Sequence, residues 1–233
     1  MATRRARDPQ AEGERLLSAI DRLVDDRDTL ISRVEAIKGA INIERDDKAY
    51  REAVAAKIID VYSVKTAIIG AATALPAVVP GAGSGIALVG GALVDMTLVL
   101  KHEVEMAMCL THLSGFDLAD ERERWLAYVL AGVRTYEVES GRSYFVDLLE
   151  AQVDILPRYT PREIFKIAAT VLGHLAIFSL SRGVIRALPL VGIFVGASTN
   201  KLMTTSVGWS CVDTLERRRR MAPREPVVEA KVT

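Results

Sequence analysis

The stretch that decides the fold is residues 66–94, TAIIGAATALPAVVPGAGSGIALVGGALV, in which 29 consecutive positions carry no charge. It contains six glycines and is interrupted by Pro76 and Pro80. Each proline lacks a backbone donor and clashes with the preceding helical turn, so a helix must end or bend here. We therefore expect an apolar helix before Pro76, a turn at residues 81–85 and a second apolar helix after it.

A second apolar tract, residues 167–200, is interrupted only by Arg182 and Arg186. A helix that spans a membrane needs about 20 apolar residues. The prolines and arginines divide the two tracts into pieces of roughly 10 to 15 residues, each too short to span unaided. Four such pieces are typical of a buried core or of a shallow re-entrant hairpin pair, and not of a simple polytopic protein.

Composition limits the classes of function. The 233-residue chain balances 30 Lys and Arg against 30 Asp and Glu, which argues against a strongly basic nucleic-acid-binding protein. Cys109 and Cys211 fit neither a disulfide framework nor a CxxC motif. The first residues include arginines but no apolar segment and cleavage site, so they do not predict a signal peptide. We expect a cytoplasmic protein that binds no nucleic acid.

Residues 1–10 are polar and expected to be disordered, and residues 11–45 are expected to form one amphipathic helix. Its apolar residues recur at alternating steps of four and three residues, and Arg27 occupies the one position of this pattern that is not apolar. These residues are Leu16, Ile20, Leu23, Leu30, Val34, Ile37 and Ile41. Such a seam predicts either docking on the protein's own core or a homodimeric coiled coil.

Capping signals place the remaining helices within a domain of residues 46–216, before a basic run and flexible tail at 217–233. Thr160 is a cap, followed by Pro161 at the first helical position and Glu163 at the third. Gly115 is a glycine stop. Further helices are expected from 46 or 47 into the first tract and at about 84–113, 117–133, 144–156, 161–185 and 189–217. The predicted fold is all-α, a helical bundle of two Pro/Gly-broken apolar helical hairpins plus an N-terminal amphipathic heptad helix.

Glycines four residues apart open one face of a helix to close approach by another helix. The predicted packing positions are Gly81, Gly85, Gly192, Gly196 and Asn200. The last helix is expected to pack through its stripe against Gly85, Gly90 or Ala92. The Asn200 amide should be hydrogen-bonded, since burying it unpaired costs about 1–3 kcal/mol. Gly196→Leu should damage the fold more than Gly141→Leu in a presumed surface loop.

The arginine run at 217–220 predicts a contact with anionic lipid headgroups, worth about 1 kcal/mol per charge near the surface. Trp209 lies up to two turns earlier and suits a membrane interface. The alternative is a solvated helix end whose arginines complement the helix dipole. The candidate membrane contacts are Trp209, Arg217, Arg218, Arg219 and Arg220.

His102, Glu105, Cys109 and His112 fall on one stripe of a helix, and all four residue types can bind a transition metal. The stripe extends about 15 Å, so a straight helix cannot wrap all four around one ion. At most two neighbours could share an ion with ligands from elsewhere. No local catalytic signature such as GxSxG is present, and no catalytic residue or cofactor is predicted.

Two segments carry a family resemblance. The first runs from Leu75-Pro76 past Asp95 to MAMCLTHLSGFDLADERERWLA (106–127), and the second is LPLVGIFVGASTNKLMTTSVGWSC (188–211). Together they resemble the EcsC family and a neighbouring domain family often attached to GTPases. The matching positions of the second segment are Pro189, Gly192, Gly196 and Asn200. In the first, Leu113-Ser114 stands where Tyr-Gly is more usual.

The resemblance covers about residues 47–216 and implies a helical, membrane-associated bacterial protein without established catalytic residues. We therefore expect a non-enzymatic protein on the inner face of the cell membrane, peripheral or shallowly inserted. Its partner would be membrane lipid or a membrane protein. The alternative is a soluble helical scaffold that self-associates through residues 16–41, and a metal-dependent enzyme is third.

Overall fold

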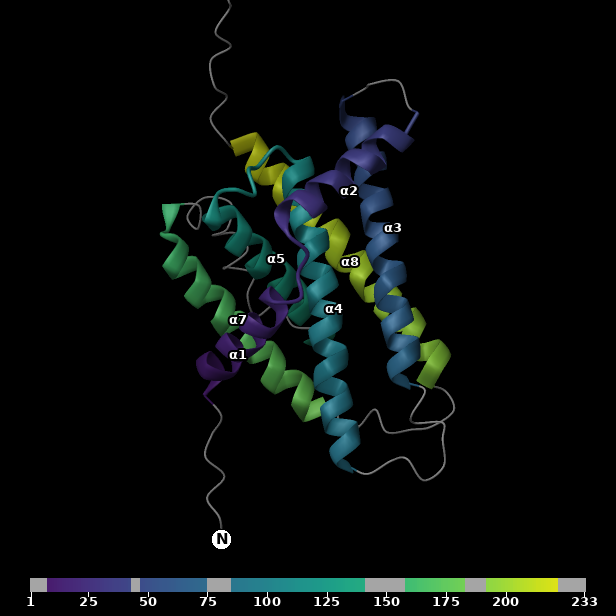
Figure 1. Ribbon diagram of the computed structural model, residues 1–233, viewed down its shortest axis with the longest axis vertical. Helices are drawn as coiled ribbons and strands as arrows, with labels where there is room; N and C mark the ends of the chain where they lie inside the picture. The colour runs from purple at the N-terminus through teal and green to yellow at the C-terminus, as the bar shows by residue number, and fades with distance from the viewer. Residues whose placement is uncertain (1–7, 43–46, 75–84, 141–157, 183–191, 222–233) are drawn as a thin grey trace, which may run out of the picture.

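The computed structural model describes residues 8–42, 47–74, 85–140, 158–182 and 192–221. Within these ranges the chain forms seven helices and no strand, which confirms the all-α prediction. The helices are α1 Pro9–Asp21, α2 Arg27–Ala40, α3 Asp47–Ala74, α4 Gly85–Leu113, α5 Glu121–Ser140, α7 Pro161–Arg182 and α8 Gly192–Met221 (Figure 1).

Helix α4 is the centre of the bundle. It packs against α3 and α8 on one side and against α5 on the other, while α5 also packs against α7 and α8 (Figure 1). Every residue of α4 from 103 to 111 is buried. A helix that is apolar on all sides is buried on all sides, and this central position follows from the apolar sequence of α4. The two charged residues in this segment, Glu103 and Glu105, therefore need internal partners.

Two predicted helix ends are confirmed. Gly115 follows α4 with a φ of 90°, a conformation that glycine adopts without strain. The Phe116 N–H then donates to the Thr111 carbonyl at 3.2 Å and closes the turn. At the start of α7, the Glu163 carboxylate accepts hydrogen bonds from the Thr160 N–H and hydroxyl, both at 2.8 Å. Both signals are local, which is why the sequence predicts them well.

The single amphipathic helix expected at 11–45 is wrong. The chain forms two helices: α1 ends at Asp21, and Asp26 begins α2 by accepting hydrogen bonds from the Thr29 N–H (2.9 Å) and hydroxyl (2.8 Å). The expected disorder of residues 1–10 also fails at its end, since Asp8 caps α1 and Pro9 is its first residue.

The heptad residues dock mainly on the protein's own core. Leu16, Ile20, Leu30 and Val34 are buried, whereas Leu23 is 46% exposed beside the break. Ile37 and Ile41 are partly buried against the core. Six of the seven apolar positions are therefore packed within the chain, four of them fully buried.

Other expectations meet the structure in part. The helix predicted at 117–133 is α5, which begins at Glu121 because the Asp120 carboxylate accepts the Arg122 N–H at 2.9 Å, and it continues to Ser140. The helix predicted at 144–156 and residues Gly81, Gly141 and Pro189 lie outside the described residues.

The sequence analysis does not predict the close crossing of α1 and α7. Gly13 of α1 and Gly173 of α7 are both buried where the two helices cross. A Cβ atom on Gly13 would overlap the Ala169 carbonyl oxygen, and one on Gly173 would overlap the Pro9 carbonyl oxygen. Only glycine allows two backbones to come this close. The first helix is thereby held on α7.

Gly13→Ala should lower the free energy of unfolding by about 3 kcal/mol, because the added methyl group meets backbone that cannot move aside. Gly39→Ala is the matched control, since nothing lies within 4 Å of its added Cβ. It should raise stability by up to about 1 kcal/mol, because alanine is the better helix former. Urea unfolding followed by circular dichroism measures both changes. Equal effects of the two substitutions would contradict the close crossing.

Candidate functional site

Three uncharged helix segments lie at the same end of the bundle. They are residues 66–74 of α3, 85–94 of α4 and 192–200 of α8, none of which contains Asp, Glu, Lys or Arg. The three helices pack against one another in pairs, and all three segments are in the lower part of the molecule in Figure 1, those of α3 and α8 side by side. We call these three segments the apolar end.

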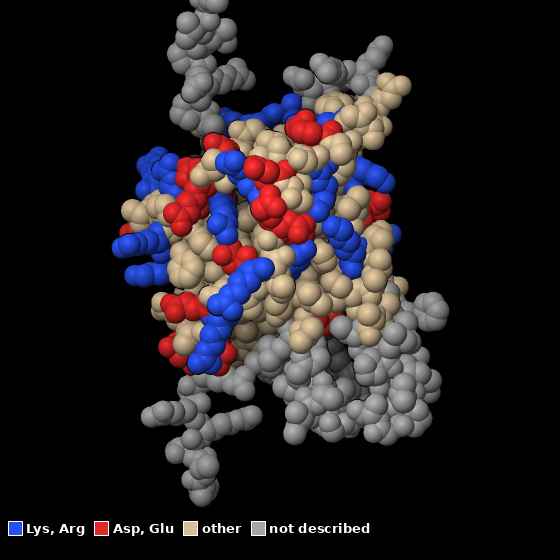
Figure 2. Space-filling model, in the orientation of Figure 1, with Lys and Arg blue, Asp and Glu red and all other residues tan. Residues whose placement is uncertain are grey.

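Large apolar side chains are exposed at the apolar end and its border. Leu202 is 70% exposed, Ile68 63%, Val94 56% and Val64 41%. On the face shown in Figure 2, charged side chains gather in the upper and left parts, and the described surface just above the grey atoms at the lower right is mainly uncharged. Several exposed apolar side chains at one site are characteristic of a surface that contacts lipid or a partner.

The prediction that the Asn200 amide is hydrogen-bonded is confirmed. The Asn200 side-chain N–H donates to the Thr66 carbonyl at 3.3 Å. This bond joins α8 to α3, and the expected packing of the stripe against Gly85, Gly90 or Ala92 stays a prediction. Along α8 the close approach documented by the structure is at Gly208, whose added Cβ would lie 2.7 Å from Ile59 of α3. For Gly85, Gly192 and Gly196 the structure describes only the helical backbone.

A buried carboxylate joins four helices just above the apolar end. Glu103 of α4 is fully buried and accepts hydrogen bonds from the hydroxyls of Thr135 in α5 (2.5 Å) and Thr204 in α8 (3.1 Å). Thr204 Oγ1 in turn lies 2.9 Å from Thr66 Oγ1 in α3. The sequence signal for this network is a glutamate in the mainly polar run 101–105 of a helix that is apolar on both sides of it, and the sequence analysis does not single it out.

Glu105 anchors the break between α1 and α2. Its buried carboxylate accepts hydrogen bonds from the Asp25 N–H (2.8 Å) and Lys101 Nζ (2.8 Å), and it lies 3.2 Å from His102 Nδ1. Burial opposes the charged form, but the hydrogen bonds from His102, Lys101 and Asp25 outweigh it and lower the pKa of Glu105 to about 2. The carboxylate is therefore structural and ionised at neutral pH.

Two residues of the predicted metal-binding stripe contact each other, and the other two contact residues of other helices. His102 contacts Glu105, Cys109 Sγ lies 3.6 Å from Tyr62 Oη, and His112 Nε2 lies 3.6 Å from Glu35. Burial raises the pKa of Cys109 to about 11, so its thiol stays protonated at neutral pH. Among the described residues no three or more His, Cys, Asp or Glu side chains are placed to hold a metal ion.

The prediction that Arg218 contacts the membrane is wrong. Arg218 is buried, its Nη2 lies 2.7 and 3.0 Å from the two carboxylate oxygens of Glu123, and its guanidinium lies 4.3 Å from the centre of the Phe116 ring. Arg217 and Arg220 form ion pairs within α8, with Asp213 at 2.9 Å and Glu216 at 3.1 Å. Trp209 is 44% exposed.

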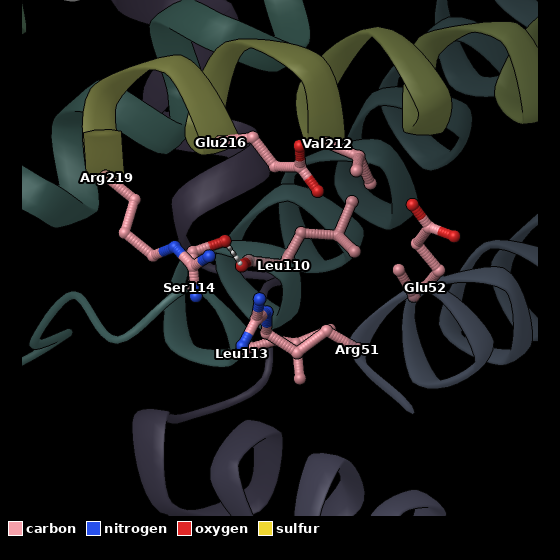
Figure 3. A pocket seen from close by; sticks show the side chains of 9 residues that line it. Arg51, Glu52, Leu110, Leu113, Ser114, Val212, Glu216 and Arg219 are labelled. Atoms are coloured by element: carbon pink, nitrogen blue, oxygen red, sulfur yellow. Dashed lines mark hydrogen bonds between the residues drawn. The ribbon is translucent and has the colours of Figure 1, made fainter. Parts of the chain in front are cut away.

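Arg219 borders a small hollow together with Arg51, at the C-terminal end of α4 (Figure 3). The hollow has a volume of about 20 Å³, enough for little more than one water molecule. Ser114 uses its hydroxyl to donate to the Leu110 carbonyl at 2.8 Å. The end of α4 carries negative partial charge, which the two arginines complement without a ligand.

Comparison of the chain with models of protein families, with curated proteins and with solved structures gives no match. The resemblance to the EcsC family therefore stays a prediction. Within the described residues, none of the helices combines the length and the apolar character needed to cross a bilayer.

The ion pair of Arg218 gives a stability prediction. Arg218→Met should lower the free energy of unfolding by about 3 kcal/mol, because it leaves the Glu123 carboxylate partly buried without its partner. Arg219→Met, one residue further on, should change it by less than about 0.5 kcal/mol. Chemical denaturation measures both. A loss confined to Arg219→Met would refute the structural role of Arg218.

The pKa of Glu105 gives a pH prediction. Its folded-state pKa of about 2 lies below the ordinary value of 4.5, so the unfolded chain takes up the proton first as the pH falls. The stabilisation is complete above pH 4.5 and is lost as the pH falls towards 2. Thermal unfolding from pH 6 to 3 should show a smaller loss of stability for Glu105→Gln than for the wild type. Identical pH profiles would exclude this role of Glu105.

Proposed function

We propose that the protein is a non-enzymatic, peripheral membrane protein that inserts its apolar end into one leaflet of a bilayer. The observation that carries the proposal is the placement of three uncharged helix segments at one end of an otherwise charged molecule. The resemblance of residues 47–216 to the EcsC family supports the same function and suggests the inner face of a bacterial cell membrane.

The lengths of the segments favour shallow insertion. Each has nine or ten residues, which corresponds to about 15 Å of helix, half of the roughly 30 Å hydrocarbon core. The segments are helical, so their backbone groups away from the helix ends are hydrogen-bonded internally, as a hydrocarbon environment requires. The apolar end can therefore reach into one leaflet without crossing the bilayer.

The expected binding is weak and reversible. The four exposed side chains Val64, Ile68, Val94 and Leu202 are only partly accessible, so burying each contributes roughly 1 kcal/mol. Their sum is a few kcal/mol, comparable with a single acyl anchor, which gives marginal membrane binding alone. This magnitude favours a peripheral protein over an integral one.

The orientation of α8 separates the predicted contacts into two groups. Trp209 is exposed seven residues beyond Leu202, about 10 Å along the helix and on the same side, which places it towards the headgroups. Arg217 lies 17 residues beyond Asn200, about 25 Å away. With the axis of α8 along the bilayer normal, the arginine run stays outside the bilayer. Binding should therefore depend little on anionic lipid.

A soluble scaffold that self-associates through residues 16–41 is supported less well. Leu16, Ile20, Leu30 and Val34 are already buried in the core. Leu23 is then the seam residue most exposed to a second copy. A protein partner at the apolar end is a separate possibility, and binding to vesicles of pure lipid distinguishes lipid from protein contact.

The double substitution Ile68→Glu and Leu202→Glu should weaken binding to phosphatidylcholine vesicles at least tenfold, because two carboxylates would enter the hydrocarbon region. Met221→Glu is the matched control, since Met221 is 59% exposed at the opposite end of α8. It should bind like the wild type. Co-sedimentation with vesicles measures all three proteins.

Two outcomes of this experiment would contradict the proposal. In one, the wild type stays in the supernatant at every vesicle concentration. In the other, Met221→Glu weakens sedimentation as much as the double substitution does. Circular dichroism of each variant shows whether the fold is retained.

A further inference from the structure

The helices α2 and α3 enclose an open apolar groove of about 850 Å³, which is within the usual size range of ligand pockets. Its floor is made by small and branched apolar side chains of both helices. These are Ala36, Ile37, Ala40, Ile41, Ala53, Ala56 and Val61. Arg33, Lys57, Asp60 and Lys65 complete the lining. The groove shares no lining residue with the apolar end, which begins directly after Lys65, and it is not needed for the proposed function.

Polarity changes along the groove. One end, near Ile41 and Ala53 where α2 and α3 approach their connection, is apolar. The other end holds Arg33 and Lys65. Along the side, Lys57 Nζ lies 3.5 Å from the Asp60 carboxylate, so this pair is neutral overall. The groove therefore has an apolar part and a cationic head.

The cationic head has an excess of positive charge. Arg33 Nη2 lies 2.8 Å from the Asp25 carboxylate, and Lys101 Nζ lies 2.8 Å from Glu105 and 3.9 Å from Asp25. Lys65 Nζ lies 4.6 Å from the centre of the Tyr62 ring. The three cations Arg33, Lys65 and Lys101 thus lie near two carboxylates, those of Asp25 and Glu105. Arg33 and Lys101 pair with these carboxylates, whereas the described contact of Lys65 is with the Tyr62 ring.

The surroundings of Lys65 favour the binding of an anion. Burial and the nearby charges of Arg33 and Lys101 lower the pKa of Lys65, whereas Glu105 and Asp25 act in the opposite direction. A carboxylate placed beside Lys65 would restore charge balance and remove the repulsion among the three cations.

We propose that the groove between α2 and α3 binds a single-chain amphiphile, a fatty carboxylate, with its headgroup at Lys65 and its hydrocarbon chain over the alanine floor. From Lys65 to Ala53 the groove follows 12 residues of α3, about 18 Å. An extended saturated chain of about 14 carbons has this length, since each bond of about 1.5 Å advances it by a little less. The alanines leave room for a slender chain.

Tetradecanoate, below its micellar concentration, is the probe for calorimetric titration of the whole 233-residue chain. The wild type should bind it saturably, one per chain. Lys65→Met, which keeps the apolar stem, should weaken binding at least tenfold because it removes a charged hydrogen bond. Tetradecan-1-ol, which lacks the charge, should bind both proteins equally. Lys48→Met is the matched control on α3 outside the groove and should bind tetradecanoate like the wild type.

A second variant tests the hydrocarbon part. Ala56→Phe fills the floor of the groove and should weaken both tetradecanoate and tetradecanol, whereas Ala19→Phe on the exposed face of α1 should not. Vesicle sedimentation of Ala56→Phe should match the wild type, so failure here is distinguishable from failure of the proposed function.

Three results overturn the proposal. The first is the absence of saturable tetradecanoate binding to the wild type. The second is wild-type affinity in both Lys65→Met and Ala56→Phe. The third is a dimer in light scattering that Ala56→Phe makes monomeric, with no tetradecanoate bound, which would assign the groove to a second copy of the chain. Unfolding curves show whether each variant is folded. If Ala56→Phe does not fold, the result for Lys65→Met decides the test.

Discussion

The rest of the bundle depends on the burial of the Glu103 carboxylate. A carboxyl group buried in an apolar core needs hydrogen-bond partners, so hydroxyls must be brought to it. Thr135 of α5 and Thr204 of α8 donate to Glu103, and Thr204 also meets Thr66 of α3. This requirement sets the register of α5 and α8 against α4, and the Thr66 to Thr204 contact extends it to α3. A slip of α5 or α8 by a turn would leave the carboxyl group short of a partner, which an all-apolar core would tolerate more easily.

The register of α3 against α8 determines where the uncharged segments lie. The Thr66 to Thr204 contact and the Asn200 bond to the Thr66 carbonyl align the C-terminal part of α3 with the N-terminal part of α8. Each helix carries its other charges on the far side of this contact, and Lys201 of α8 lies between Asn200 and Thr204. The bundle is therefore polarised along its length, with an apolar end and a charged end where Arg218 pairs with Glu123. That polarity is the physical basis of the proposed membrane contact.

Local signals in the sequence predict much of this fold, whereas contacts between distant residues remain hidden. The stop at Gly115, the start at Thr160 and the need of Asn200 for a partner depend on nearby backbone or on one amide, so they can be predicted. The break between α1 and α2 was missed because the heptad spacing continues across it. Its anchor is a hydrogen bond from the Asp25 N–H to Glu105, 80 residues away. The crossing of Gly13 and Gly173 is hidden for the same reason.

The insertion of the apolar end is the central claim, and a fluorescent reporter at each end of α8 tests it most directly. Cys109 and Cys211 are buried and burial raises the pKa of both thiols, to about 11 and about 12, so a thiol-reactive nitrobenzoxadiazole dye should label only an added cysteine. Emission is measured for dye-labelled Leu202→Cys and Met221→Cys as phosphatidylcholine vesicles are added. The account predicts a blue shift and stronger emission at position 202 and no change at 221. No change at 202, or a larger change at 221, would contradict it.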